Sequence, residues 1–165
     1  MSITKVCIFD AYGTLFDVNA ACRELSIEVG EKWQDLANLW RLRQVEYTWL
    51  RNSMNEYIDF WEITGNALEY AMDVLEIKNQ ELKDKLLGLY YKLDAYPEVK
   101  KVLKKLKKEG YQTGILSNGS LNMLSSAVKN ANIQNYLDKV LSVETCKIYK
   151  PSNKVYELVK KNYYV

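Results

Sequence analysis

The chain has 165 residues, 48% of them hydrophobic, so it can bury a core the size of one ordinary domain or of one domain with an insertion. Its formal charge of +2 is too small for the basic face that nucleic-acid binding needs, and no apolar run of about 18 residues points to a membrane or to secretion. We therefore expect a cytoplasmic protein without nucleic-acid or membrane partners. Because there is no histidine, Ser–His, Cys–His and histidine–metal mechanisms are excluded, and three widely spaced cysteines predict neither a disulfide framework nor a zinc site.

The apolar pattern changes twice along the chain. Residues 3–9 form a short, nearly continuous apolar run, which predicts a strand covered on both faces at the centre of a parallel sheet. Between about 19 and 93 the apolar residues recur at helical spacings, and we expect three or four helices packed together. The rest predicts a helix at 98–109 ended by Gly110, a strand at 111–117, a helix near 121–131, a strand at 139–143 and a helix from about 152. This order predicts an α/β fold with a Rossmann-like, doubly wound parallel sheet and a helical insertion after its first strand.

Polar side chains follow the predicted strands. Asp10 ends the first strand, and Ser117 and Asn118 end the second. Lys150 comes shortly after the third, where Pro151 favours a helix start. Because reactive groups collect beyond the carboxyl ends of parallel strands, we expect these side chains to converge. A lysine near an aspartate keeps the carboxylate ionised, which makes it available as a nucleophile.

Each of these residues also has an ordinary structural interpretation. An aspartate after a strand is often a turn former or a helix cap, residues 117–119 fit a simple turn, and Lys150 fits a solvated surface lysine. The lysine-rich segment 100–110 resembles a binding patch, but its apolar residues form one helical stripe, so we interpret the lysines as a solvated helix face.

Four motifs are spread over essentially the whole chain. They are DAYGTLFD from Asp10, LWRLRQVEYTWLR at 39–51, ILSNGS at 115–120, and YKP at 149–151 followed by VYEL at 155–158. Together they resemble the haloacid dehalogenase superfamily, and more closely its type II L-2-haloacid dehalogenases. The resemblance implies a Rossmann-like core of residues 1–15 and 97–165 and a helical cap of residues 16–96. It also implies hydrolytic removal of halide from short L-2-haloalkanoic acids, with inversion.

The residue two positions after Asp10 separates the branches of this superfamily. In the phosphatase branch it is a second aspartate, which acts as a general acid, and Mg²⁺ binds among the carboxylates. Here it is Tyr12. A halide leaving group needs no proton, and a substrate with one carboxylate needs no bridging cation, so we expect carbon–halogen displacement with no metal and no cofactor. A phosphatase stays as an alternative that Tyr12 disfavours.

The resemblance also implies a role for each matching residue around the nucleophile. Asp10 attacks C2 of the substrate, expels halide and forms an ester. Lys150 orients Asp10 and keeps it charged, and Thr14 fixes the loop that follows it.

On the substrate side, the resemblance places Arg41, reaching from the cap, and Asn118 as donors to the departing halide. Preorganised donors help most where charge develops in the transition state. Ser117 and backbone N–H groups after Asp10 would bind the substrate carboxylate. The remaining pocket residues are Tyr12, Val45, Phe60 and Tyr156, and an ordinary core position is an equally good interpretation of Phe60.

The family's pattern continues beyond the helix at 152–162 into a further strand whose end supplies an acidic motif that helps to activate water. The printed chain ends at Val165, so a truncated, inactive relative that acts as a fragment or binding module stays as an alternative. Without the further strand, residues 3–10 would form an apolar sheet edge, and we expect marginal stability or association through it. Family habit also implies a homodimer through the cap.

Overall fold

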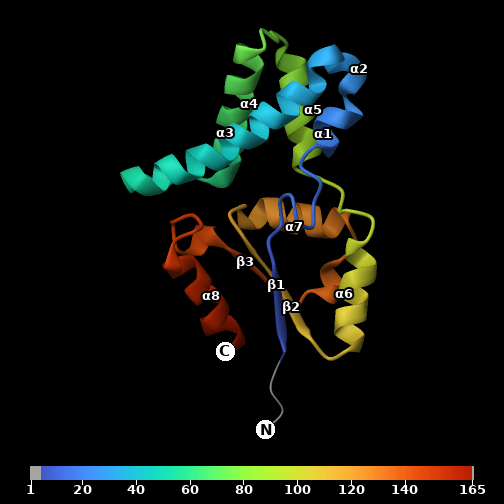
Figure 1. Ribbon diagram of the computed structural model, residues 1–165, viewed down its shortest axis with the longest axis vertical. Helices are drawn as coiled ribbons and strands as arrows, with labels where there is room; N and C mark the ends of the chain where they lie inside the picture. Colours follow the sequence, from blue (N-terminus) through green and yellow to red (C-terminus); the bar gives the residue numbers. More distant parts are fainter. Residues whose placement is uncertain (1–4, 165) are drawn as a thin grey trace.

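A small parallel sheet and a group of helices lie at opposite ends of the molecule in the computed structural model, which describes residues 5–164 (Figure 1). The sheet contains β1 (Val6–Phe9), β2 (Gln112–Ser117) and β3 (Lys139–Ser142), in the order β1-β2-β3, and both pairs are parallel. The carboxyl ends of the strands point toward the helices. The chain leaves the sheet after β1 and returns to it at α6 (Val99–Lys108).

The central strand of the described sheet is β2. It is buried from its second residue onward because β1 and β3 pair with its two edges, whereas every residue of β1 is only partly buried. The prediction that residues 3–9 form the central strand is therefore wrong for the sheet that the structure describes, and the expected edge position is confirmed. The first two residues of that predicted strand lie outside the described residues.

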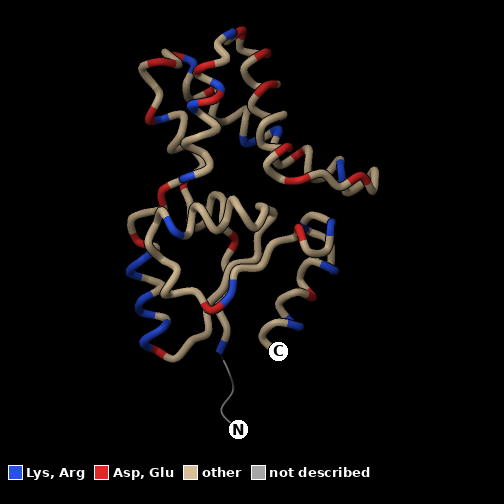
Figure 2. The backbone as a smooth tube through the Cα atoms, turned by 180° about the vertical axis from the view of Figure 1, so that it is seen from behind, with Lys and Arg blue, Asp and Glu red and all other residues tan. Residues whose placement is uncertain are grey.

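The helices around the sheet follow the predicted order. They are α6, α7 (Leu121–Asn130) and α8 (Asn153–Tyr163), and α6 and α8 lie on opposite sides of the sheet (Figure 1). Gly110 follows α6 with φ of 81°, a left-handed conformation that costs glycine little, so the predicted end of the helix is confirmed. The lysines of α6 lie along its solvent side (Figure 2), as expected for a solvated face over the buried Val99 and Leu103.

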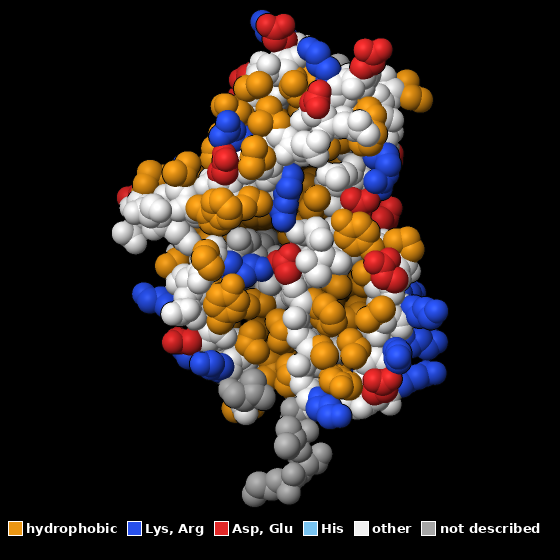
Figure 3. All heavy atoms as spheres, viewed as in Figure 1, with side chains coloured by type: hydrophobic (Ala, Val, Ile, Leu, Met, Phe, Trp, Pro, Cys, Tyr) orange, Lys and Arg blue, Asp and Glu red, His pale blue; other side chains and the backbone are white. Residues whose placement is uncertain are grey.

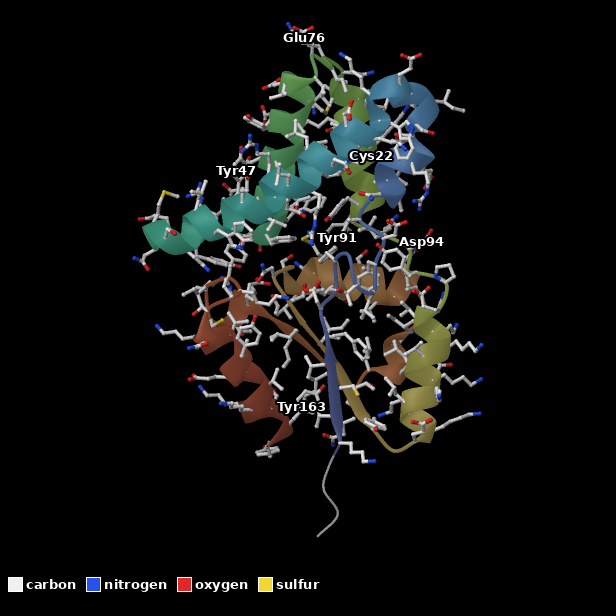
Figure 4. The ribbon with its side chains drawn as sticks, viewed as in Figure 1. Cys22, Tyr47, Glu76, Tyr91, Asp94 and Tyr163 are labelled. Atoms are coloured by element: carbon white, nitrogen blue, oxygen red, sulfur yellow. The ribbon has the colours of Figure 1, made fainter. Side chains whose placement is uncertain are left out.

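Tyr163 ties the end of α8 to the central strand. Its side chain points from α8 toward the sheet (Figure 4), and its hydroxyl donates a hydrogen bond to the carbonyl oxygen of Thr113 at 3.0 Å. Gly114 makes room for this contact, because a Cβ atom there would lie 1.9 Å from the Tyr163 hydroxyl oxygen. The close approach requires glycine in the middle of β2.

Between β1 and β2 the regular elements of the described chain are helices. Those that precede α6 are α1 (Ala20–Glu24), α2 (Ser26–Val29), α3 (Trp33–Met54), α4 (Phe60–Val74) and α5 (Gln80–Tyr90), with a short 3₁₀ turn at Gly30–Lys32. The sequence predicted three or four helices, and the difference arises at Leu25, where the chain breaks into two short helices. Side chains of Asp59 and Asn79 accept hydrogen bonds from backbone N–H groups and cap α4 and α5.

The longest helix, α3, contacts both ends of the molecule. Its first half packs against α4, where Trp40 donates a hydrogen bond from Nε1 to the carbonyl oxygen of Thr64 at 2.9 Å. Its second half extends beyond the helix group and passes over the sheet side of the molecule (Figure 1). Within the described chain, no helix has both the length and the apolar character that a membrane crossing requires.

Candidate active site

A small cavity of about 40 Å³ lies where the carboxyl ends of β1 and β2 face α3. The loop after β1, α3, the start of α4 and the end of β2 all contribute to its walls. The residues that line it are Asp10, Tyr12, Arg41, Val45, Thr48, Phe60, Ser117 and Asn118. All but Thr48 were expected at the site. Asp10, Ser117 and Asn118 were expected there because parallel strands deliver the residues at their carboxyl ends to one edge, and the others because of the family resemblance.

Asp10 and Lys150 form an ion pair at the edge of this cavity. Lys150 Nζ donates to Asp10 Oδ1 at 2.5 Å and to the carbonyl oxygen of Leu116 at 3.1 Å. The hydroxyl of Thr14 donates to the other carboxylate oxygen, Oδ2, at 3.4 Å. The carboxylate is thus held in one orientation by a cation on one oxygen and a hydroxyl on the other.

The loop after Asp10 is a tight turn. The carbonyl oxygen of Ala11 accepts hydrogen bonds from the N–H groups of Thr14, Leu15 and Phe16 at 3.2, 2.8 and 3.0 Å. Gly13 has φ of 93°, and only glycine adopts this conformation without strain. The turn therefore brings the chain back past Asp10 immediately after the strand.

Ser117 and Asn118 are each fixed by a hydrogen bond, the first local and the second to the segment before α8. Ser117 Oγ accepts from the N–H of Gly119 at 3.0 Å, and Asn118 Oδ1 accepts from the N–H of Lys150 at 3.0 Å. Because the oxygen of the Asn118 amide is used in this way, its NH₂ group is the donor left for a bound molecule. Gly119 passes so close to the ring of Tyr12 that a Cβ atom there would lie 2.5 Å from it.

Arg41 enters the cavity from α3. Its two terminal nitrogens donate to the carbonyl oxygen of Tyr12 at 2.7 Å and to Gln44 Oε1 at 2.8 Å. Val45 and Thr48 follow at helical spacings of four and seven residues, so α3 presents these three side chains on one face. Through its hydrogen bond to the carbonyl oxygen of Tyr12, the guanidinium is linked to the loop that follows Asp10.

Gln44 is a fully buried residue that supports Arg41 and was not expected at the site from the sequence. Its Oε1 also accepts a hydrogen bond from the hydroxyl of Tyr90 at 3.1 Å, and its Nε2 donates to Thr64 Oγ1 at 2.8 Å. A polar side chain three residues after Arg41, on the buried face of a helix, was the available signal. Every polar atom of its amide side chain has a partner, which keeps the arginine in place.

Aromatic side chains form the apolar wall of the cavity. Tyr12 is 3% exposed, stacks on Tyr90 at 5.8 Å between ring centroids, and lies 5.9 Å from the ring of Phe60. Burial raises the pKa of the Tyr12 phenol well above its ordinary value, so the phenol stays protonated at neutral pH. This wall offers an apolar surface to a small bound molecule.

The structure does not bring every expected residue to the cavity. Tyr156 is 45% exposed on α8 and does not line it, because it lies on the outer face of that helix. Within residues 5–164, no group of three or more His, Cys, Asp or Glu side chains is arranged to hold a metal ion.

Comparison with known proteins identifies the family. The family model described as haloacid dehalogenase-like hydrolase matches residues 4–165. The chain belongs to this family. Among haloacid dehalogenase-like hydrolases, (S)-2-haloacid dehalogenase 4A of Burkholderia cepacia is 44% identical over 154 residues, which are 93% of this chain and 67% of that protein. (S)-2-haloacid dehalogenase 1 of Pseudomonas sp. strain CBS-3 is 42% identical over 158 residues, which are 95% of this chain and 70% of that protein.

Solved structures of the family have the same fold. A crystal structure of a dehalogenase superposes with a TM-score of 0.97 at 41% identity, over 100% of this chain and 74% of that one. The L-2-haloacid dehalogenase from Xanthobacter autotrophicus with chloropropionic acid covalently bound superposes with a TM-score of 0.89 at 33% identity, over 99% of this chain and 66% of that one. The α/β fold predicted from the sequence is confirmed.

Proposed function

We propose that this chain hydrolyses short L-2-haloalkanoic acids to halide and 2-hydroxy acids through an ester on Asp10. The observation that carries the proposal is one cavity in which the Asp10 carboxylate, oriented by Lys150, meets the guanidinium of Arg41. The named activities of the relatives, and the covalently bound chloropropionic acid of the Xanthobacter enzyme, support the same chemistry.

In the first step, a carboxylate oxygen of Asp10 attacks C2 of the substrate from the side opposite the halogen. The carbon–halogen bond breaks, the halide leaves with the bonding electron pair, and C2 inverts as the ester forms. In the second step, water adds to the ester carbonyl carbon of Asp10, the 2-hydroxy acid leaves, and one proton is released. Aspartate is thereby restored for the next turnover.

The donors of the cavity suit the two negative charges of this reaction. Arg41 and the free NH₂ group of Asn118 are available to the departing halide, where charge develops in the transition state. Ser117, which lines the cavity, would bind the substrate carboxylate through its hydroxyl, together with backbone N–H groups directly after Asp10, since those of residues 13–16 already donate within the loop. Fixed donors of this kind need little reorganisation when the reaction occurs.

The apolar wall limits the substrate to a short chain. Tyr12, Val45 and Phe60 line a cavity of about 40 Å³, which favours a methyl group or hydrogen on C2 over a long alkyl chain. Tyr12 also argues against the alternative of a phosphatase, since its buried phenol occupies the position where a general acid carboxylate would be needed.

Halide release in the presence of EDTA tests the proposal directly. We expect the protein to release chloride from L-2-chloropropionate with EDTA present and to leave p-nitrophenyl phosphate intact. A protein that hydrolyses the phosphate ester only when Mg²⁺ is added would support the phosphatase instead. The D-enantiomer serves as the control, because backside attack from a fixed Asp10 selects one configuration at C2.

We also propose that residues 16–96 act as a cap on a core of residues 1–15 and 97–165. The grouping of α1–α5 at one end of the molecule supports this division, as does the entry of Arg41 into the site from α3 (Figure 1). A homodimer through the cap is supported by exposed apolar side chains along the projecting part of α3 (Figure 3). They are Trp49, Leu50 and Met54.

A further inference from the structure

A side-chain amide near the end of α3 is bound to the segment that carries Lys150. Asn52 Nδ2 donates to the carbonyl oxygen of Tyr149 at 2.8 Å, and the N–H of Tyr149 donates to Asn52 Oδ1 at 2.8 Å. An amide that is paired in both directions with the backbone of one residue fixes the direction of that backbone as well as its distance. Tyr149 immediately precedes Lys150, so this pair acts on the main chain that carries the partner of Asp10.

The backbone pair is reinforced by the side chain of Tyr149. Tyr149 is fully buried, its hydroxyl donates to the carbonyl oxygen of Ile58 at 2.5 Å, and its ring stacks on Tyr57 at 5.0 Å. On the other side, the N–H of Lys150 donates to Asn118. Residues 149–150 are therefore held between the helix group on one side and the end of β2 on the other, which restricts the motion of their backbone.

The same helix carries Arg41. Arg41 and Asn52 are eleven positions apart, which is close to three helical turns, so both lie on the face of α3 that points to the sheet, about 16 Å apart along the axis. Arg41 binds the loop after Asp10 through the carbonyl oxygen of Tyr12, and Asn52 binds the segment before Lys150. Two contacts at separate points of one helix fix its distance from the site and its tilt relative to the sheet.

We propose that Asn52 is a positioning residue for the reaction. Its contact with Tyr149 keeps the halide donor Arg41 and Lys150, the partner of Asp10, at a fixed position relative to each other. The inference rests on the proposed dehalogenation, and nothing in the family comparison assigns this role to Asn52. Removal of the amide leaves two backbone groups of Tyr149 without their partner and lets the end of α3 shift relative to Lys150. Displacements of about 1 Å at a reacting centre reduce rates by about a hundredfold.

The test replaces the amide by an apolar side chain of similar size. In Asn52→Leu we expect kcat for chloride release from L-2-chloropropionate to fall by about tenfold to a hundredfold, while KM changes by less than about threefold. Asn52→Asp keeps the acceptor for the N–H of Tyr149 and loses the donor to its carbonyl oxygen, so it should give an intermediate loss of kcat. Asn66→Leu, at an exposed position of α4, is the matched control and should keep the wild-type kcat.

A second measurement does not depend on turnover. Amide hydrogen exchange of the Tyr149 N–H should become at least about tenfold faster in Asn52→Leu and stay unchanged in Asn66→Leu, since only the first change removes its acceptor. The proposal is overturned if kcat of Asn52→Leu stays within twofold of the wild type, or if its loss disappears when the assay is run well below the melting temperature. It is also overturned if Tyr149 exchange does not change.

These outcomes separate the inference from the proposed function. If the unaltered protein releases no chloride, the dehalogenation itself fails, whatever the exchange rate of Tyr149 shows. If the unaltered protein is active and Asn52→Leu is equally active, only the positioning role fails.

Discussion

At the scale of single residues, Lys150 orients the reactive carboxylate more than it stabilises the fold. The side chains of Lys150 and Asp10 are 20% and 38% exposed, so solvent screens part of their attraction. Screening does not change the orientation of the Asp10 carboxylate. Lys150 also donates to the carbonyl oxygen of Leu116, so its ammonium group keeps one fixed position beside Asp10 Oδ1. Among the described residues, Asp10 Oδ2 has only the long contact with Thr14, which makes it the better placed oxygen for attack.

Replacement of Asp10 by asparagine tests the nucleophile. Asp10→Asn should lower halide release by at least about a thousandfold, because an amide has nearly the same shape but is a poor nucleophile. Chloride release and intact-protein mass spectrometry measure the outcome: the wild type should gain the mass of the ester on incubation with L-2-chloropropionate, and the variant should not. An unchanged circular dichroism spectrum confirms that the variant is folded. Substantial chloride release by Asp10→Asn would assign the nucleophile to another residue.

Replacement of Arg41 by lysine tests the donor to the halide. A lysine ammonium cannot reproduce the planar guanidinium that binds both the Tyr12 carbonyl and Gln44, so kcat of Arg41→Lys should fall by about a hundredfold or more. Arg43→Lys is the matched control, because Arg43 lies on the same helix and pairs with Glu46 outside the cavity. Equal activity of the two variants would show that the contacts of Arg41 serve only the packing of α3.

The site residues that follow strands could be predicted from the sequence, whereas those that act through other side chains could not. Asp10, Ser117 and Asn118 stand at strand ends, where topology alone brings polar groups together. Gln44 lies within a helix, and no local pattern shows that a buried glutamine supports an arginine. Tyr156 was expected in the pocket from the motif that contains it, but the rotation of α8 about its axis turns it outward, and motif position does not determine that rotation.

At the scale of elements, close packing of α8 on the sheet depends on one glycine. Gly114 faces Tyr163, and an added Cβ atom would lie 1.9 Å from the hydroxyl oxygen and 2.9 Å from the carbonyl oxygen of Lys139. Strand and helix boundaries were predictable from apolar spacing, since burial on one face imposes it. The contact between Gly114 and Tyr163 was not predictable, because it joins positions that are far apart in the sequence and depends on how α8 packs on the sheet.

The Gly114→Ala variant tests this packing. The methyl group forces Tyr163 and the neighbouring backbone apart, so we expect the free energy of unfolding to fall by about 1–3 kcal/mol, measured by urea denaturation. Gly88→Ala is the control: Gly88 lies within α5 with no heavy atom near an added Cβ, so alanine should stabilise the helix by about 0.5–1 kcal/mol. Tyr163→Phe combined with Gly114→Ala should recover part of the loss. If Gly114→Ala is as stable as the wild type, α8 does not pack on β2 this closely.

At the scale of the whole molecule, the site is formed jointly by the helix group and the sheet side of the molecule. Arg41 comes from the helix group, whereas Asp10, Asn118 and Lys150 come from the ends of the strands and the segment before α8. The order of elements in the sequence was enough to predict a helical insertion after the first strand. The height of α3 above the sheet was not predictable, because it depends on long-range contacts such as Arg41 with Tyr12.

The remaining prediction concerns association through the helix group. Trp49, Leu50 and Met54 are each more than half exposed on the second half of α3, and exposed apolar side chains that gather on one element mark candidate protein interfaces. We expect sedimentation to show a dimer at micromolar concentration, and Trp49→Glu with Met54→Glu to convert it to a monomer, because two buried carboxylates would be desolvated in the interface. Leu121→Glu, on the exposed surface of α7, is the control and should leave the dimer intact. A dimer that resists the α3 changes and dissociates with Leu121→Glu would place the interface on the sheet side of the molecule instead.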